Sequence, residues 1–111
     1  MQGIVFLGDK KLEIQDFDDP SPGPDDVIIE IKASGMCGSD LKFYRANNGP
    51  SSLGLGGDDK PVIAGHEPCG TIVEIGSNVP KKTFQLDTRV MQHHYEGCGT
   101  CSHCSTGWQQ L

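Results

Sequence analysis

Alternation of apolar and polar residues is clearest from Asp26 to Ala33 and predicts a half-buried β-strand in this segment. The residues expected on its apolar face are Val27, Ile29, Ile31 and Ala33, and those on its polar face are Glu30 and Lys32. Shorter patterns predict a hairpin of residues 3–6 and 11–14 around Gly8-Asp9, and further strands at 71–75 and 89–92. Glycine and proline separate these segments, as expected where turns join short strands.

The other segments carry no strand pattern. Residues 19–26 (DPSPGPDD) form a polar loop whose prolines exclude regular structure, and the glycine-rich residues 45–60 are expected to form a long surface loop. Residues 39–44 are predicted to form a short helix, with Ser39 or Asp40 capping the free N–H groups at its start. Residues 96–107 are dominated by small and polar side chains and cysteine. The sequence therefore predicts a mainly β domain with one short helix and a Cys-rich lobe.

The charge balance limits the partners that the chain can bind. Its 111 residues include 9 Lys+Arg and 15 Asp+Glu, which gives a formal net charge of -6. Nucleic acids and anionic membranes require clustered basic residues, so neither is an expected partner. No apolar run reaches the length of a transmembrane helix, and the N-terminus lacks the pattern of a signal peptide. We therefore expect a cytoplasmic protein with a single domain at most.

The cysteines indicate metal binding rather than a disulfide framework, because their count of five is odd and no export signal precedes them. Cys98, Cys101 and Cys104 are each separated by two residues, a spacing at which a tight turn directs successive thiolates at one tetrahedral ion. This spacing also begins an iron–sulfur motif, but that motif needs a further cysteine where the chain has Trp108. Zinc is therefore the preferred ion.

A closed zinc site needs a fourth ligand in addition to the lobe's cysteines. The nearest nitrogen donors in the sequence are His93, His94 and His103. A single histidine near a metal motif is weak evidence for coordination. We interpret these histidines as exposed or hydrogen-bonded side chains, and coordination by one of them stays open as the alternative.

Cys37 and the pair His66-Glu67 form a second candidate site. Cys37 lies in SGMCGSD just after the alternating strand, and His66-Glu67 lie in PVIAGHEPCG just before the next strand. Strand ends flanked by glycine are where a sheet presents side chains to a ligand. A thiolate, an imidazole and a carboxylate can hold a catalytic zinc with one position open. From spacing alone, a buried cysteine and a core histidine are the alternative, because spacing proves no proximity.

Three blocks occur along the chain in a characteristic order: Cys37-Gly38-Ser39-Asp40, then Gly65-His66-Glu67-Pro68-Cys69-Gly70 followed by Gly76 and Val79, then Cys98, Cys101 and Cys104. Together these blocks resemble the zinc-containing alcohol dehydrogenases of the medium-chain dehydrogenase/reductase superfamily. The resemblance implies a GroES-like fold, which is a partly open barrel of short strands with a zinc lobe. It further implies that the lobe's three cysteines hold a structural zinc ion.

The resemblance also assigns roles around the second site. Cys37, His66 and Glu67 would be ligands of a catalytic zinc ion, with Glu67 able to join or leave the coordination. Ser39 would relay the proton of a small alcohol substrate, and Asp40 would hydrogen-bond the ring of His66. Zinc would stabilise the alkoxide while hydride passes to NAD(P), giving an aldehyde or ketone.

Several family features fall outside this sequence. The fourth structural cysteine would follow one position after Leu111, and the third protein ligand of the catalytic zinc and the NAD(P)-binding Rossmann domain would lie further on. We therefore expect the chain to be a truncated, N-terminal part of a GroES-like catalytic domain, with its structural-zinc lobe at about residues 93–111. Such a piece is expected to be inactive alone and to self-associate. The alternative function is a zinc-binding or interaction module without catalysis.

Overall fold

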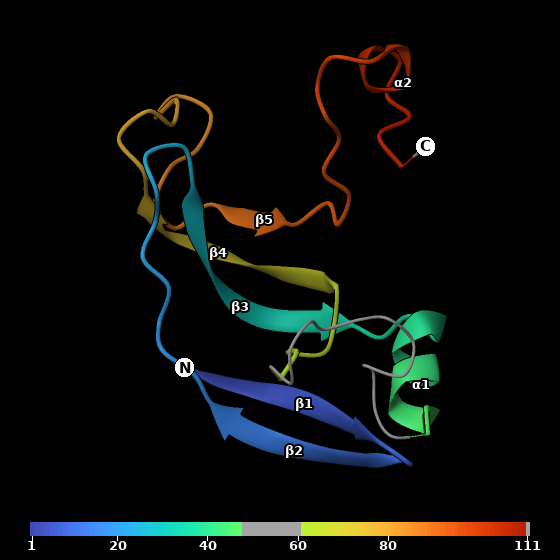
Figure 1. The fold of residues 1–111 in the computed structure, drawn as a ribbon. Coiled ribbons are helices and arrows are strands. Elements are labelled where there is room, and N and C mark those ends of the chain that lie inside the picture. Colours follow the sequence, from blue (N-terminus) through green and yellow to red (C-terminus); the bar gives the residue numbers. More distant parts are fainter. Residues whose placement is uncertain (48–60, 111) are drawn as a thin grey trace.

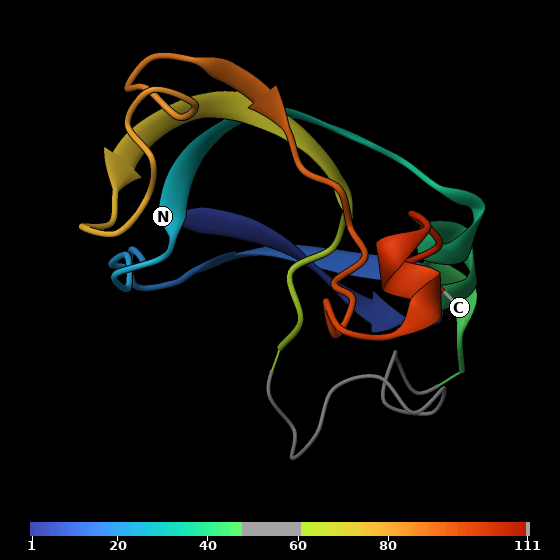
Figure 2. The same ribbon diagram turned by 90° about the horizontal axis from the view of Figure 1, so that it is seen from above.

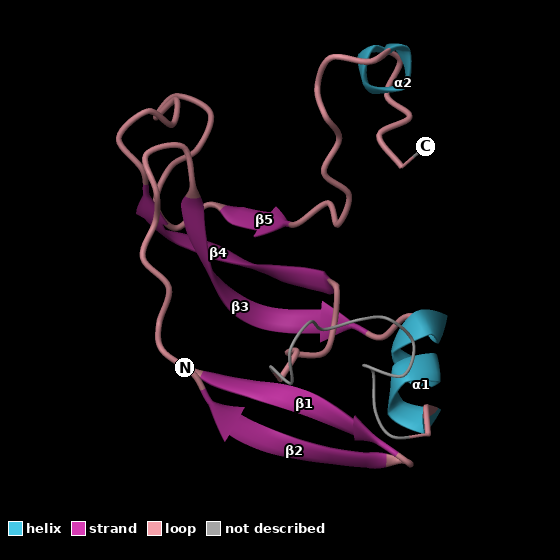
Figure 3. Cartoon of the chain, in the orientation of Figure 1, coloured by secondary structure: helices cyan, strands magenta, loops and turns pink. Residues whose placement is uncertain are grey.

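The computed structural model describes residues 1–47 and 61–110, whose strands form two antiparallel sheets (Figure 1). One sheet pairs β1 (Gln2–Gly8) with β2 (Lys11–Asp16). In the other sheet, β4 (Glu67–Ile75) lies between β3 (Val27–Gly35) and β5 (Arg89–Met91). The helices among the described residues are α1 (Gly38–Arg45) and α2 (Ser102–Ser105). Strands and loops dominate the described chain (Figure 3), which confirms the mainly β fold predicted from the sequence.

The sheet of β3, β4 and β5 is strongly curved and arches over the β1–β2 hairpin (Figure 2). The described strands form no closed barrel, in agreement with the partly open barrel expected. The buried apolar side chains of the described residues are Val5, Phe6, Ile72 and Val79. Neither described helix has the length and apolar character of a membrane-spanning segment.

The predicted hairpin is present, and its turn supports α1. Asp9 and Lys10 have positive φ angles of 50° and 61°, which suits the two-residue turn between β1 and β2. The Asp9 N–H donates to the Ala46 carbonyl (2.9 Å) and the Lys10 N–H donates to the Tyr44 carbonyl (2.8 Å). These bonds satisfy carbonyls at the end of α1 that the helix itself leaves without partners. The hairpin therefore fixes the position of the helix that begins beside Cys37.

The predicted strand at 26–33 is β3, but its simple two-face pattern is wrong beyond its middle. The pairing with β4 shifts between Ile28 and Ile29 and again between Ile31 and Ala33. Such bulges interrupt the alternation of faces along a strand. Ile31 is 50% exposed, although the sequence pattern places it on the apolar face.

The remaining sequence predictions concern the loops and the first helix. Residues 19–26 contain no helix or strand, as their prolines predict. The helix predicted at 39–44 is α1, which is slightly longer than predicted and ends at Arg45. Arg45 is therefore not part of the predicted 45–60 loop, and most of that loop, residues 48–60, lies outside the described residues.

Replacing Gly76 by alanine is expected to lower the free energy of unfolding by about 1–3 kcal/mol, the usual cost of overpacking. A Cβ atom at Gly76 would lie 2.2 Å from the Gly23 carbonyl oxygen and 2.4 Å from the Pro24 carbonyl oxygen. Both are backbone atoms, so the contact cannot be relieved by a rotamer change. Urea unfolding measures the loss. Gly38→Ala is the matched control, because a Cβ atom at Gly38 meets nothing within 4 Å; equal midpoints for the two variants would contradict this prediction.

Candidate metal centres

Two pairings bring the segment of His66 to the end of β3. Ile63 forms an isolated antiparallel bridge with Val5 of β1, and the Ala64 N–H donates to the Ile4 carbonyl (2.7 Å). Directly after His66, Glu67 pairs with Gly35 at the end of β3. The chain on one side of His66 is thus attached to β1, and the chain on its other side is attached to β3. Gly65 makes the required turn with a φ of 91°, a conformation that favours glycine.

Cys37 reaches the same place from the other side. It follows β3 and is the N-cap residue of α1. Ligand atoms of Cys37, His66 and Glu67 all lie within 4.8 Å of one another. We call these residues the Cys37 cluster. The sequence leaves open whether Cys37 and His66 are close, and the structure places them together.

Asp40 joins the two neighbouring ligand candidates with its two carboxylate oxygens. Oδ2 accepts a hydrogen bond from the Cys37 N–H (2.8 Å), and Oδ1 lies 3.3 Å from His66 Nδ1. The carboxylate is only 3% exposed as a residue and lies in the first turn of α1, where a negative charge is favourable. Because Asp40 occupies the Nδ1 side of the ring, the His66 Nε2 atom remains for a metal ion.

The electrostatics of the Cys37 cluster favour a thiolate. The backbone N–H and the hydroxyl of Ser39, followed by His66, lower the pKa of Cys37 below its usual value. The hydrogen bond with Cys37, supported by Asp40, raises the pKa of His66. Ser39 Oγ also lies 3.5 Å from His66 Nε2. The residue expected to relay a proton therefore lies beside the nitrogen expected to bind zinc.

The donors of the Cys37 cluster fit a zinc ion by their chemistry. Sulfur, imidazole nitrogen and carboxylate oxygen are the ligands that zinc takes in proteins. Three protein ligands plus an open position are the arrangement of catalytic zinc sites, whereas structural sites use four. His66 is partly buried and Glu67 is exposed, so the cluster is open to solvent on the carboxylate side.

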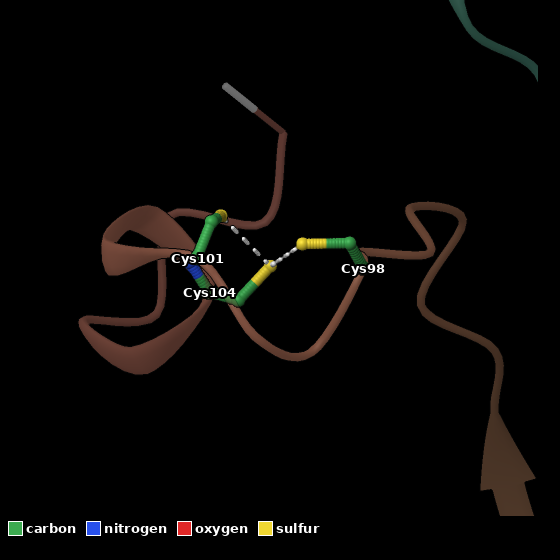
Figure 4. A group of neighbouring side chains, drawn as sticks. All are labelled: Cys98, Cys101 and Cys104. Carbon is green, nitrogen blue, oxygen red and sulfur yellow. Dashed lines mark hydrogen bonds between the residues drawn. The ribbon is translucent and has the colours of Figure 1, made fainter.

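The second group of thiols is compact and lies in a lobe of its own, near the C-terminal end (Figure 1). Cys104 Sγ lies 3.6 Å from Cys101 Sγ and 3.8 Å from Cys98 Sγ, so it is shared by both contacts (Figure 4). Thiolates bound tetrahedrally to zinc at about 2.3 Å lie about 3.8 Å apart. The spacing between these sulfur atoms therefore fits zinc.

A helix that the sequence analysis did not predict organises this lobe. Cys101 is the N-cap of α2, and its sulfur accepts from the Cys104 N–H (3.5 Å). The Thr100 N–H and hydroxyl, together with the Cys101 N–H, lower the pKa of Cys98 to about 6. This lowering of the pKa favours the thiolate form of Cys98, which is the form that binds metals. The short-range hydrogen bonds that form this turn thus also favour metal binding by its thiols.

The histidines considered as further lobe ligands do not join either group of potential metal donors among the described residues. Instead, the ring of His94 packs edge-on against His66, with centroids 5.3 Å apart. The reason is the strand register: Met91 pairs with Cys69, and the Gln92 N–H donates to the Pro68 carbonyl (3.1 Å). The chain after β5 therefore runs past His66. The sequence alone leaves open where His94 lies, and the register of β5 on β4 brings it to this place.

Replacing Asp40 by asparagine is expected to weaken zinc binding at the Cys37 cluster by about 10- to 100-fold, the usual cost of losing an outer-shell partner. Asparagine keeps the size of the side chain but removes the charge next to His66 Nδ1. Competition with a coloured chelator, in a Cys98→Ser background that disables the lobe, measures the affinity. Asp18→Asn, an exposed carboxylate of the loop after β2, is the matched control. An affinity equal to that of the control would contradict this role of Asp40.

Comparison with known proteins shows the family of the chain. The alcohol dehydrogenase GroES-like domain model matches residues 23–111. The chain is 35% identical over 113 residues to an uncharacterised zinc-type alcohol dehydrogenase-like protein of Escherichia coli strain K12, covering 97% of this chain and 30% of that protein. It is 35% identical over 111 residues to the sorbitol dehydrogenase of Bacillus subtilis strain 168, covering 100% of this chain and 30% of that protein.

Solved structures share the fold as well. A short-chain alcohol dehydrogenase of Escherichia coli CFT073, in complex with the cofactor NADH, matches 98% of this chain and 29% of its own, with 28% sequence identity and a TM-score of 0.74. The GroES-like fold expected from the sequence is thus confirmed. The chain spans about 30% of the length of the curated relatives it matches.

Proposed function

Because the chain belongs to the alcohol dehydrogenase GroES-like family of zinc-type, medium-chain dehydrogenases, we propose that it provides the zinc-bearing catalytic part of an NAD(P)-dependent alcohol dehydrogenase. The observation that carries this proposal is the convergence of Cys37, His66 and Glu67 within 4.8 Å. The buried carboxylate of Asp40 contacts two of these three residues.

In this proposal Cys37 Sγ, His66 Nε2 and the Glu67 carboxylate hold the ion. Zinc, when bound, supplies Lewis-acid polarisation of the alcohol oxygen. Asp40 keeps the proton of the His66 ring on Nδ1, so that Nε2 stays available as a ligand. The Ser39 hydroxyl, 3.5 Å from Nε2, would relay the alcohol proton by accepting it while giving its own proton to solvent water. Hydride acceptance by NAD(P) is assigned to polypeptide other than the described residues, because β3 and β4 on either side of α1 pair antiparallel and not as the parallel strands of a dinucleotide-binding unit.

The lobe of Cys98, Cys101 and Cys104 is proposed to hold a structural zinc ion. None of the residues of α2 is buried, so apolar packing provides little stability for this helix. A helix of four residues is far too short to be stable by itself. A metal ion that draws the thiolates together would supply the missing stability. The two proposed ions thus have different tasks, one chemical and one structural.

An open coordination position is what separates the proposed catalytic site from a zinc-binding module without catalysis. Cobalt can replace zinc and makes the site visible by its absorption bands. In a cobalt-loaded chain with Cys98→Ser, added imidazole is expected to change these bands in a saturable manner, because a fourth position is free. Bands that do not respond to imidazole would indicate a closed site and favour the non-catalytic module. Cys37→Ser in the same background, which should lose the bands, is the control that assigns them to the Cys37 cluster.

A further inference from the structure

The last residue of β3 and the first residue of β4 are direct partners across the sheet. Gly35 pairs with Glu67 at the end of an antiparallel ladder. Side chains of residues that pair directly lie on the same face of a sheet, with Cβ atoms about 4.5–5.5 Å apart. The nature of residue 35 therefore decides how much room the Glu67 side chain has.

The space above Gly35 is filled by Glu67. A Cβ atom at position 35 would lie 2.5 Å from Glu67 Oε2, 3.2 Å from its Cβ and 3.5 Å from its Cδ. The first of these distances is shorter than any real contact of a Cβ atom, so an alanine at position 35 would displace the carboxylate. The Glu67 side chain lies flat over the glycine along its whole length.

Backbone conformation does not explain why glycine occupies position 35. The described glycines with a positive φ are Gly8, Gly65, Gly99 and Gly107, and Gly35 is not among them. An alanine at position 35 would therefore meet no backbone strain of the left-handed region. What glycine provides here is room for a neighbouring side chain.

We propose that Gly35 is a positioning residue, whose missing side chain leaves the space in which the Glu67 carboxylate lies beside Cys37 and His66. The inference rests on the proposed function, because it concerns a ligand of the proposed catalytic zinc site. Glu67 is exposed, so burial does not hold its side chain in place. The contact with the bare backbone of β3 keeps the carboxylate within 4.8 Å of the other two ligand atoms.

A double-mutant cycle in the Cys98→Ser background tests this proposal, with the cobalt dissociation constant as the readout. The chains are the Cys98→Ser parent, Gly35→Ala, Glu67→Ala and the combination of both. Gly35→Ala is expected to weaken cobalt binding by about 10- to 100-fold, like other losses of ligand support. In the Glu67→Ala background the same substitution is expected to have no further effect. Gly38→Ala, where a Cβ atom meets nothing within 4 Å, is the matched control for an added methyl group near Cys37.

Two results would overturn the proposal. Gly35→Ala could bind cobalt as tightly as the parent does. Alternatively, it could weaken cobalt binding by the same factor in the presence and in the absence of the Glu67 carboxylate. The second result would mean that position 35 acts on the fold and not on Glu67. A parent chain without cobalt bands that depend on Cys37 would instead contradict the proposed function, and this outcome is distinguishable from the other two.

A further variant keeps the test decisive if Gly35→Ala does not fold, which circular dichroism of the metal-free chains checks. Glu67→Asp shortens the side chain and withdraws its carboxylate from the space over Gly35 without changing β3. The proposal predicts a loss of cobalt affinity close to that of Glu67→Ala. An affinity equal to that of the parent would show that the fit of the longer side chain over Gly35 is unimportant.

Discussion

Replacing Cys104 by serine is expected to unfold the lobe around α2 while the two sheets remain folded. Cys104 Sγ is the sulfur that contacts both Cys98 Sγ (3.8 Å) and Cys101 Sγ (3.6 Å). Its loss removes a zinc ligand and the contact at the centre of the group. No residue of α2 is buried, so nothing else among the described contacts of this helix replaces the metal. For structural zinc in small domains, binding and folding are one process.

Hydrogen exchange of the zinc-loaded chain measures this effect directly. The amides of Ser105, Thr106 and Gly107, which bond within the α2 turn, are expected to lose their protection in Cys104→Ser. Amides of β3 and β4 are expected to keep theirs. Cys69→Ser is the matched control, because Cys69 lies in β4 and belongs neither to the Cys37 cluster nor to the thiols of the lobe. Protection of the α2 turn that survives Cys104→Ser would contradict a metal-dependent lobe.

Replacing His66 by alanine is expected to abolish tight zinc binding at the Cys37 cluster, with a loss larger than the about 10- to 100-fold typical of outer-shell changes. The substitution removes a ligand and leaves one oxygen of the buried Asp40 carboxylate without its partner. Chelator competition in the Cys98→Ser background measures the affinity.

His93→Ala is the matched control for this substitution. Its ring contacts His94 and Tyr95, and it belongs to neither metal group of the described residues. We expect this control to bind zinc like the parent chain. Retention of parent affinity by His66→Ala would contradict the proposed ligand set.

Much of the fold follows from local sequence signals. The hairpin could be predicted from Gly8-Asp9 and the flanking apolar residues, although its two turn residues are Asp9 and Lys10, one position later than predicted. The start of α1 could be predicted in part, because Asp40 does accept a hydrogen bond from the Cys37 N–H (2.8 Å). The N-cap residue is Cys37, however, and not Ser39 or Asp40 as predicted. These features depend on residues that are neighbours in the chain.

Features that depend on strand register could not be predicted from the sequence. The pairing of β3 with β4 passes over Lys32, so Ala33 no longer follows the alternation that the sequence pattern predicts, and Ala33 is exposed. Register likewise brings His94 against His66, because the position of β5 along β4 decides which residues follow the strand into the site. Alternation shows that a strand exists, whereas register depends on the partner strand.

The two candidate sites likewise differ in how far they could be predicted from the sequence. The thiols of the lobe are close because short spacing and a tight turn bring them together, and the sequence alone indicates this. The proximity of Cys37 and His66 needs the bridge of Ile63 to Val5 and the pairing of Gly35 with Glu67. Neither pairing can be derived from spacing. Resemblance to a family with these motifs indicated the proximity where physical reasoning on the sequence could not.

The metal content of the purified chain and its variants tests most directly the central claim, that two independent zinc centres lie on this scaffold. Elemental analysis after dialysis against a weak chelator is expected to find about two zinc ions per chain, one for each donor group. Cys37→Ser and Cys98→Ser are each expected to remove about one of them, and the double variant both. A zinc content that Cys37→Ser leaves unchanged in a folded chain would contradict the account, because the Cys37 cluster would then hold no metal.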